Sequence, residues 1–192
     1  MVSDVEKLSF NDGDLTVTTT AGGAVTLTGS GLDDEITLVG GVGATLEGTG
    51  GADTITGAGG ADTITGSDGD DTLEGGAGND VIVGGADTDT VVFAGDKGDF
   101  TFAVASDGTL TVTDTNTGTA LGVDTVSGVE KLSFNDGDLT VTTTAGGAVT
   151  LTGSGLDDEI TLVGSVGATL EGTGGADTIT GAGGADTLEG GA

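Results

Sequence analysis

The sequence predicts an all-β protein, a parallel β-solenoid with 18 residues per coil that is interrupted by an antiparallel β-hairpin. Three observations support this fold class: a glycine-rich nine-residue repeat, an aliphatic residue at one fixed place in every repeat, and a longer tandem repeat that contains the short one. The composition agrees with it. The chain has 42 Gly and no Pro, and its hydrophobic residues are almost all aliphatic, which suits tight turns around a thin core.

The nine-residue period is clearest over residues 48–83, which read GTGGADTIT, GAGGADTIT, GSDGDDTLE and GGAGNDVIV. The register extends over residues 20–92, with one extra residue at Leu38, so that eight blocks result. The eighth position of every block is aliphatic: Leu27, Ile36, Leu46, Ile55, Ile64, Leu73, Ile82 and Val91.

Each block divides into a glycine-rich turn and a three-residue piece such as Thr54-Ile55-Thr56, in which polar and apolar residues alternate. Alternation with a period of two is typical of a strand with one buried face. Stacked strands would therefore bury one aliphatic column and expose a ladder of threonines. Two blocks would form one coil.

The sixth position of the block is acidic in six of the eight blocks: Asp34, Asp53, Asp62, Asp71, Asp80 and Asp89. Val25 and Ala44 hold this position in the other two blocks, which we expect to form coils without a metal ion. Turn carbonyls that converge beside a carboxylate need a hard cation, and calcium accepts six to eight oxygen ligands in loose geometry. The chain has no His and no Cys, which makes zinc, copper and iron sites improbable.

The motif GGxGxDxUx, in which U is aliphatic, is the repeats-in-toxin (RTX) nonapeptide, and residues 75–83 match it at every fixed position. The chain therefore resembles the RTX family. The resemblance implies a right-handed parallel β-roll in which several Ca²⁺ ions lie between the turns of blocks n and n+2. Each ion would be held by aspartate and by backbone carbonyls.

Carried over residue by residue, the resemblance places Asp62 and Asp80 along one edge and Asp34, Asp53, Asp71 and Asp89 along the other. In the second copy of the pattern it adds Asp158, Asp177 and Asp186, although we expect fewer complete sites there. Carbonyl ligands are expected from the turns that contain Gly48, Gly50, Gly57, Gly59, Gly66, Gly75, Gly84, Gly172 and Gly181.

The longer repeat has an offset of 124 residues, because Val2–Gly66 recurs as Val126–Gly190 with four differences. We expect an excerpt of a longer tandem array with four parts. These are the end of a preceding cap segment (1–19), a first RTX β-roll (20–92), a β-hairpin cap and connector (93–143), and a second, truncated β-roll (144–192).

The connector is expected to contain a β-hairpin, because two alternating segments, 100–105 and 109–113, flank the turn Ser106-Asp107-Gly108. A third strand is expected over Val129–Phe134. Val81 and Val83 point outward from the predicted roll, and we expect the hairpin to cover that outer surface. A plain linker is the alternative.

The charge excludes several classes of function. The chain carries 32 acidic residues against three lysines, a net charge of -29, which excludes nucleic acid and anionic membrane surfaces as partners. No apolar run of about 18 residues is present, so no membrane insertion is expected. An enzyme is not expected, because there is no His or Cys and the serines have no base beside them.

The sequence therefore predicts a calcium-binding structural repeat module of a secreted bacterial protein. An adhesin stalk, a surface layer or a biofilm-matrix fibre would fit, exported by type I secretion and folding on calcium at the cell surface or in the extracellular matrix. Three alternatives stay open: a non-catalytic repeat region of a secreted toxin or hydrolase, an ice- or ligand-binding solenoid that uses the threonine ladder, and self-association into fibres or layers.

Overall fold

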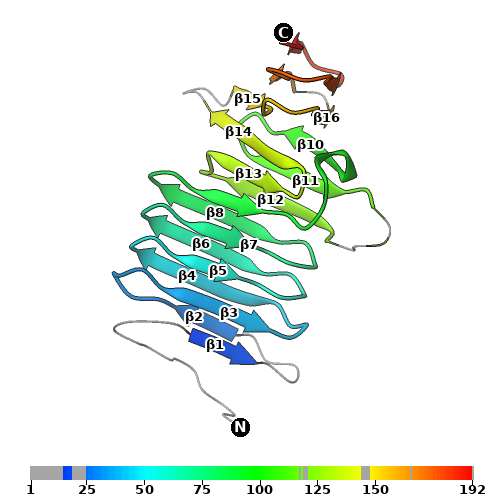
Figure 1. Cartoon of the computed structure of the whole chain (residues 1–192). Coiled ribbons are helices and arrows are strands. Elements are labelled where there is room, and N and C mark those ends of the chain that lie inside the picture. The colour runs from blue at the N-terminus through cyan, green and yellow to red at the C-terminus, as the bar shows by residue number, and fades with distance from the viewer. Residues whose placement is uncertain are drawn as a thin grey trace.

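The chain forms a tall stack of short strands that lie across its long axis, with β1 and β19 at opposite ends (Figure 1). This computed structural model describes residues 15–18, 25–116, 118, 121–143, 148–164 and 166–191. Most of the expected preceding segment, residues 1–19, lies outside the described residues. The described strands form two sheets of ten and nine strands.

The ten-stranded sheet has the order β1 (Leu15–Thr18), β3 (Glu35–Val39), β5 (Thr54–Thr56), β7 (Thr72–Glu74), β9 (Thr90–Val92), β13 (Lys131–Phe134), β14 (Gly137–Thr143), β15 (Val149–Thr152), β17 (Thr169–Glu171) and β19 (Thr187–Glu189). The nine-stranded sheet has the order β18 (Thr178–Thr180), β16 (Glu159–Val163), β10 (Phe100–Val104), β11 (Leu110–Asp114), β12 (Val123–Ser127), β8 (Val81–Ala86), β6 (Thr63–Asp68), β4 (Ala44–Gly50) and β2 (Val25–Thr28).

The predicted solenoid is confirmed by the strand register. In the first roll, odd-numbered and even-numbered strands belong to different sheets, and each strand from β1 to β7 pairs in parallel with the strand two places later. Ile55 lies opposite Leu73 and Ile64 opposite Ile82, which is 18 residues per coil. The step from Ile36 to Ile55 is one residue longer, as expected from the extra residue at Leu38.

The core is the aliphatic column that the period predicts. All eight of its side chains are at most 3% exposed: Leu27, Ile36, Leu46, Ile55, Ile64, Leu73, Ile82 and Val91. Each strand adds one such side chain to the space between the sheets, so the core grows with the stack and has no centre. Leu38 is buried as well, because the longer strand β3 alternates through one more inward position.

The expected hairpin is confirmed, since β10 and β11 pair antiparallel and a tight turn with Gly108 at a φ of 89° joins them. The connector does not end the sheets. Strand β12 pairs in parallel with β8, β13 with β9, and β10 with β16 of the second roll. The two sheets therefore continue through the connector from one roll to the next.

The connector widens the core with aromatic rings. Phe93, Phe100, Phe102 and Phe134 are at most 7% exposed, and their ring centroids lie 5.2–6.1 Å apart in four pairs. The expectation that the hairpin covers the outer surface of the roll is wrong at Val81, which is 44% exposed. The hairpin strands β10 and β11 are members of the nine-stranded sheet and do not cover its outer face. Their apolar side chains therefore point inward, into the core.

Helical structure in the described part of the chain is limited to one 3₁₀ turn, η1 (Lys97–Asp99). No described helix has the length and apolar character needed to cross a bilayer.

Candidate metal centre

The aspartates at position six stack into two rows, one before each set of parallel strands. We call Asp34, Asp53, Asp71 and Asp89, which precede β3, β5, β7 and β9, the four-aspartate ladder. We call Asp62 and Asp80, which precede β6 and β8, the two-aspartate ladder. The structure therefore places the first-roll aspartates along two edges in the arrangement expected from the sequence.

Each ladder is joined by backbone-to-carboxylate hydrogen bonds. The backbone N–H of Asp53 donates to Oδ1 of Asp71 at 2.8 Å, and the N–H of Asp62 donates to Oδ1 of Asp80 at 2.8 Å. These bonds span 18 residues, one coil. Ala44 has no carboxylate of its own, but its N–H still donates to Oδ1 of Asp62 at 2.7 Å. One carboxylate oxygen of Asp53, Asp62, Asp71, Asp80 and Asp89 thus binds the backbone of the preceding coil.

The second carboxylate oxygen is the unusual feature of the ladders. Oδ2 is buried and has no hydrogen-bond partner in five of the described aspartates: Asp53, Asp71, Asp80, Asp89 and Asp177. A buried charged oxygen without a partner is costly, so each of these atoms needs a ligand. An ion that accepts oxygen ligands would satisfy them.

The other aspartates satisfy Oδ2 within their own turn. Asp34 and Asp158 accept from the backbone N–H and the hydroxyl of Ser30 and Ser154. Asp62 accepts from the N–H of Ala58 at 3.4 Å, which is a long contact. Asp186 accepts from the N–H of Ala182 at 2.8 Å. The turns with serine therefore leave less unsatisfied charge.

Each block that carries an aspartate begins with a glycine, and this glycine lies against Oδ2 of the aspartate. A Cβ at Gly57 would lie 2.6 Å from Oδ2 of Asp62, and one at Gly84 would lie 2.5 Å from Oδ2 of Asp89. A Cβ at Gly48 would also come within 2.9 Å of the carbonyl oxygen of Gly66, one coil further on. Carboxylate and carbonyl oxygens thus border the same small space, which a side chain would fill.

The same relation to Oδ2 holds for the expected glycines at the first position, namely Gly48, Gly57, Gly66, Gly75, Gly84, Gly172 and Gly181. It does not hold for two of the expected turn glycines. Gly50 pairs with Asp68 in the sheet register, and Gly59 forms an isolated bridge with Ala77. Both lie further from the carboxylates.

Burial raises the pKa of five ladder carboxyls, those of Asp53, Asp62, Asp71, Asp80 and Asp89. Desolvation, opposed in part by the backbone N–H bond of Asp34 and aided by repulsion from Asp71, raises the pKa of Asp53 to about 6. Desolvation is also the main cause at Asp89, where the pKa rises to about 6. The pKa values of Asp62, Asp71 and Asp80 move in the same direction for the same reason. These five carboxyls therefore resist full ionisation when no metal is bound.

This leads to a prediction for the metal-free protein. Because the folded-state pKa of Asp53 and Asp89 lies above the ordinary value of 3.8, the folded state binds more protons than the unfolded state between those values. Stability in calcium-free buffer should therefore rise as the pH falls from about 7.5 to about 5. Far-UV circular dichroism of the calcium-free chain measures it, since β structure lost near neutral pH should return as the pH falls. A further loss of β structure as the pH falls over this range would contradict the prediction.

A cation in these turns has to use the main chain. Within the described residues, no three His, Cys, Asp or Glu side chains converge on one point. The available donors are one or two carboxylates with the carbonyl oxygens of the glycine turns. This all-oxygen set suits a hard cation, and its irregular geometry suits calcium better than magnesium.

The second roll differs at its first turn. Asp158 is 2% exposed, and its Oδ1 lies 3.0 Å from Nζ of Lys97, which is fully buried. Nζ also contacts Oδ1 of Asp136 at 3.2 Å and donates to its carbonyl oxygen at 2.9 Å. Asp158 therefore already has a cationic partner. Asp177 and Asp186 are partly exposed, near the last described coil.

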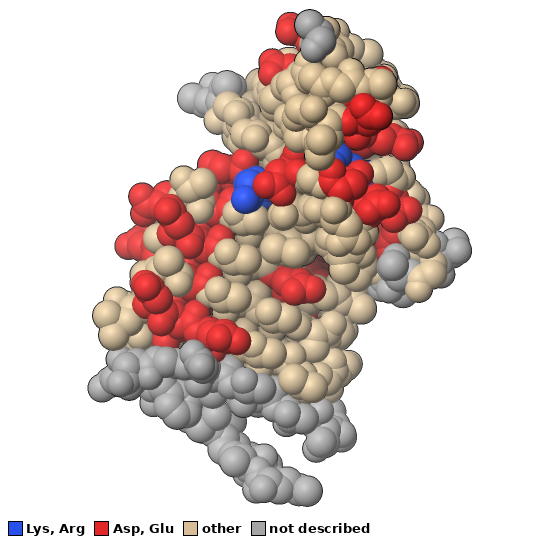
Figure 2. Space-filling view, viewed as in Figure 1, with Lys and Arg blue, Asp and Glu red and all other residues tan. Residues whose placement is uncertain are grey.

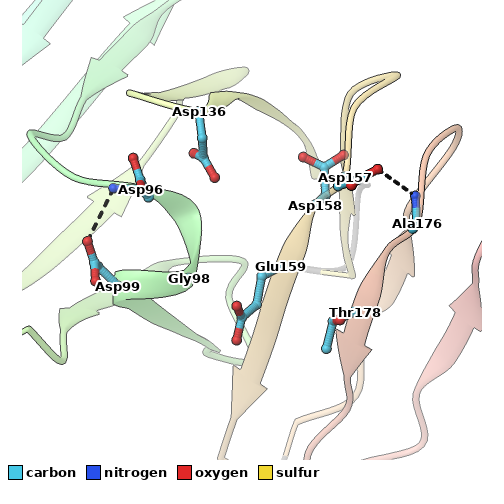
Figure 3. Close-up of a pocket in the computed structure, with 9 residues that line it drawn as sticks. All are labelled: Asp96, Gly98, Asp99, Asp136, Asp157, Asp158, Glu159, Ala176 and Thr178. Atoms are coloured by element: carbon cyan, nitrogen blue, oxygen red, sulfur yellow. Dashed lines mark hydrogen bonds between the residues drawn. The ribbon is translucent and has the colours of Figure 1, made fainter.

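An open pocket of about 450 Å³ adjoins Lys97, with acidic side chains from η1, the loop before β14 and the turn before β16 on its walls (Figure 3). Acidic side chains also gather along one edge of the first roll, and very little basic surface is visible beside them (Figure 2).

Sequence reasoning missed two residues that join the ladders, Asp124 and Glu130. Oδ1 of Asp124 accepts from the N–H of Asp80 at 2.8 Å, and Oε2 of Glu130 accepts from the N–H of Asp89 at 3.0 Å. A partial signal existed for the first, because Asp124-Thr125-Val126-Ser127 repeats the DxUx half of the nonapeptide.

The fold and the ladders together define a β-roll with cation-binding turns. Comparison with known families agrees. The model of the RTX calcium-binding nonapeptide repeat matches residues 39–73, 65–97 and 163–192. The chain therefore belongs to the RTX repeat family, and calcium is the ion that such repeats bind.

Among solved structures, the chain is similar to the extracellular lipase LipA from Serratia marcescens, at 20% sequence identity and a TM-score of 0.43. The match covers 92% of this chain and 30% of the lipase chain. The chain thus spans under a third of that protein. No curated protein matches.

Proposed function

We propose that this chain is a structural module of a secreted extracellular protein, and that it folds when its turns bind calcium outside the cell. The observation that carries the proposal is the row of buried Oδ2 atoms that have no partner. The RTX repeats support calcium as the missing ligand. The expected ligands are Asp53, Asp62, Asp71, Asp80, Asp89 and Asp177, with carbonyl oxygens of the adjoining glycine turns.

The role is proposed to be structural, since what the described chain offers is a regular stack that lengthens by repetition. The near-identical copies at an offset of 124 residues support this, because repeat number would then set length, as in other solenoids. An adhesin stalk, a surface layer or a matrix fibre would use such a module, and export by type I secretion is part of the proposal.

Calcium binding can be tested by isothermal titration of the 192-residue chain with Ca²⁺ and, as a control, with Mg²⁺. We expect several Ca²⁺ ions per chain and much weaker binding of Mg²⁺. The variant Gly75→Ala should bind fewer ions, because its Cβ would meet Oδ2 of Asp80, one of the buried oxygens without a partner.

Gly41→Ala is the matched control, because nothing lies within 4 Å of a Cβ there. Equal binding of both metals, or an equal loss in both variants, would contradict the proposed site.

A further inference from the structure

The two-aspartate ladder continues past the last nonapeptide repeat into the connector. Within the repeats, the N–H of Asp62 donates to Oδ1 of Asp80 at 2.8 Å, and the N–H of Val81 donates to the carbonyl of Asp62 at 2.9 Å. At the next step, the N–H of Asp80 donates to Oδ1 of Asp124 at 2.8 Å, and the N–H of Thr125 donates to the carbonyl of Asp80 at 2.8 Å. Asp124 thus occupies the next position of the two-aspartate ladder, although it lies 44 residues after Asp80 along the chain.

The strand that follows Asp124 repeats the register of a true coil. Val126 of β12 lies opposite Ile82 of β8, as Ile82 lies opposite Ile64 of β6. Val126 is 1% exposed and extends the aliphatic column. The segment that carries Asp124 is therefore half a coil, although it lacks the glycine motif.

The four-aspartate ladder continues in the same way. The N–H of Asp71 donates to Oδ1 of Asp89 at 3.0 Å, and the N–H of Asp89 donates to Oε2 of Glu130 at 3.0 Å. The carbonyl oxygen of Gly128 lies beside Gly84, as the carbonyl oxygen of Gly84 lies beside Gly66. In the repeats the first glycine and the acid are five positions apart, as in Gly84 and Asp89, whereas here they are two apart.

Both continuations face a carboxylate oxygen that has no partner. Oδ2 of Asp80 and Oδ2 of Asp89 are buried and lack a hydrogen bond, and the two residues are at most 1% exposed. Asp124 is 3% exposed, so its carboxylate is also largely withdrawn from solvent.

The described lysines do not neutralise these carboxylates. Lys97 pairs with Asp136 and Asp158, and Lys131 pairs with Asp138 at 3.3 Å. Two acidic side chains from the connector are therefore brought against two buried, unsatisfied aspartates with no cation of the described chain beside them.

We propose that Asp124 and Glu130 complete two further calcium sites, one on each edge, between the last nonapeptide coil and the connector. Asp80 and Asp124 would share one ion, and Asp89, Glu130 and the carbonyl oxygen of Gly128 would hold the other. Calcium would then dock β12 and β13 on the roll, so that the calcium-binding unit extends beyond the repeat motif. This inference rests on the proposed function.

The test is the number of bound ions, measured by equilibrium dialysis of the full chain at saturating Ca²⁺. Asp124→Asn and Glu130→Gln each keep the oxygen that accepts the ladder N–H, so the hydrogen bond can persist without the charge. Each variant should bind one Ca²⁺ fewer than the unsubstituted chain. Asp107→Asn, an exposed substitution at the hairpin turn, should bind the full number.

Asp62→Asn separates this inference from the proposed function. If Asp62→Asn loses an ion and the two connector variants lose none, the connector sites do not exist and the calcium-binding roll stands. If the unsubstituted chain binds no calcium, both ideas fail.

Anomalous diffraction from crystals of the unsubstituted chain grown in calcium keeps the inference testable if a variant does not fold. Calcium peaks beside Asp124 and Glu130 would support it. Peaks confined to the turns between repeats would overturn it.

Discussion

Removal of calcium at neutral pH is expected to unfold the first roll. Without a cation, four of its aspartates keep a buried Oδ2 atom that has no partner, and the net charge of -29 opposes a compact state. One site at 100 times its Kd adds about 2.7 kcal/mol to the folded state. Two such sites already match the stability of a marginal domain, about 5 kcal/mol. Far-UV circular dichroism during a titration with a chelator should therefore show a cooperative loss of β structure.

Sodium chloride at high concentration is the control for this experiment, because salt screens the net charge without filling the turns. Magnesium is a second control. Recovery of β structure with calcium alone would support specific sites. If β structure persists in chelator, the aliphatic column is sufficient for folding and the ladders need no ion.

Replacing Lys97 with Met is expected to destabilise the junction between the connector and the second roll by about 3–5 kcal/mol, the usual cost of removing one partner from a buried ion pair. The ammonium group is fully buried between Asp136, in the loop before β14, and Asp158, in the turn before β16. Without it, the buried carboxylate of Asp158 would have no counter-charge. Urea unfolding at saturating calcium measures the loss, and hydrogen exchange should locate it at β16 and β18.

Lys131→Met is the matched control, because the ion pair of Lys131 with Asp138 is exposed and should contribute no more than about 1 kcal/mol. The double variant Lys97→Met with Asp158→Asn removes both charges and should recover part of the stability. Equal losses at Lys97 and Lys131 would show that burial of the first pair has no energetic consequence.

The sequence was sufficient to predict the features that repeat locally. The aliphatic column from Leu27 to Val91 and the two rows of aspartates follow from the nine-residue period, because a solenoid places equivalent positions above one another. The extra residue at Leu38 could be located for the same reason. Such features depend on nearest-neighbour stacking, which a periodic sequence specifies fully.

The contacts that the sequence did not predict depend on where the connector packs against the two rolls. Glu130 meets Asp89 across 41 residues, and the side chain of Lys97 reaches Asp158 in the next roll. Neither contact belongs to a period, so no local pattern marks it. The error at Val81 has the same origin, because a strand that continues a sheet and a hairpin that covers its face have similar sequence alternation.

The orientation of the strands has a mechanical consequence. The strands lie across the long axis (Figure 1), so the hydrogen bonds between coils run along it. Tension between the two ends of the stack would load these bonds one coil at a time and peel the stack from an end. A released coil of 18 residues extends to about 60 Å, whereas it occupied about 4.8 Å of the stack. An array of such units would lengthen stepwise under load, and the calcium concentration would set the force of each step.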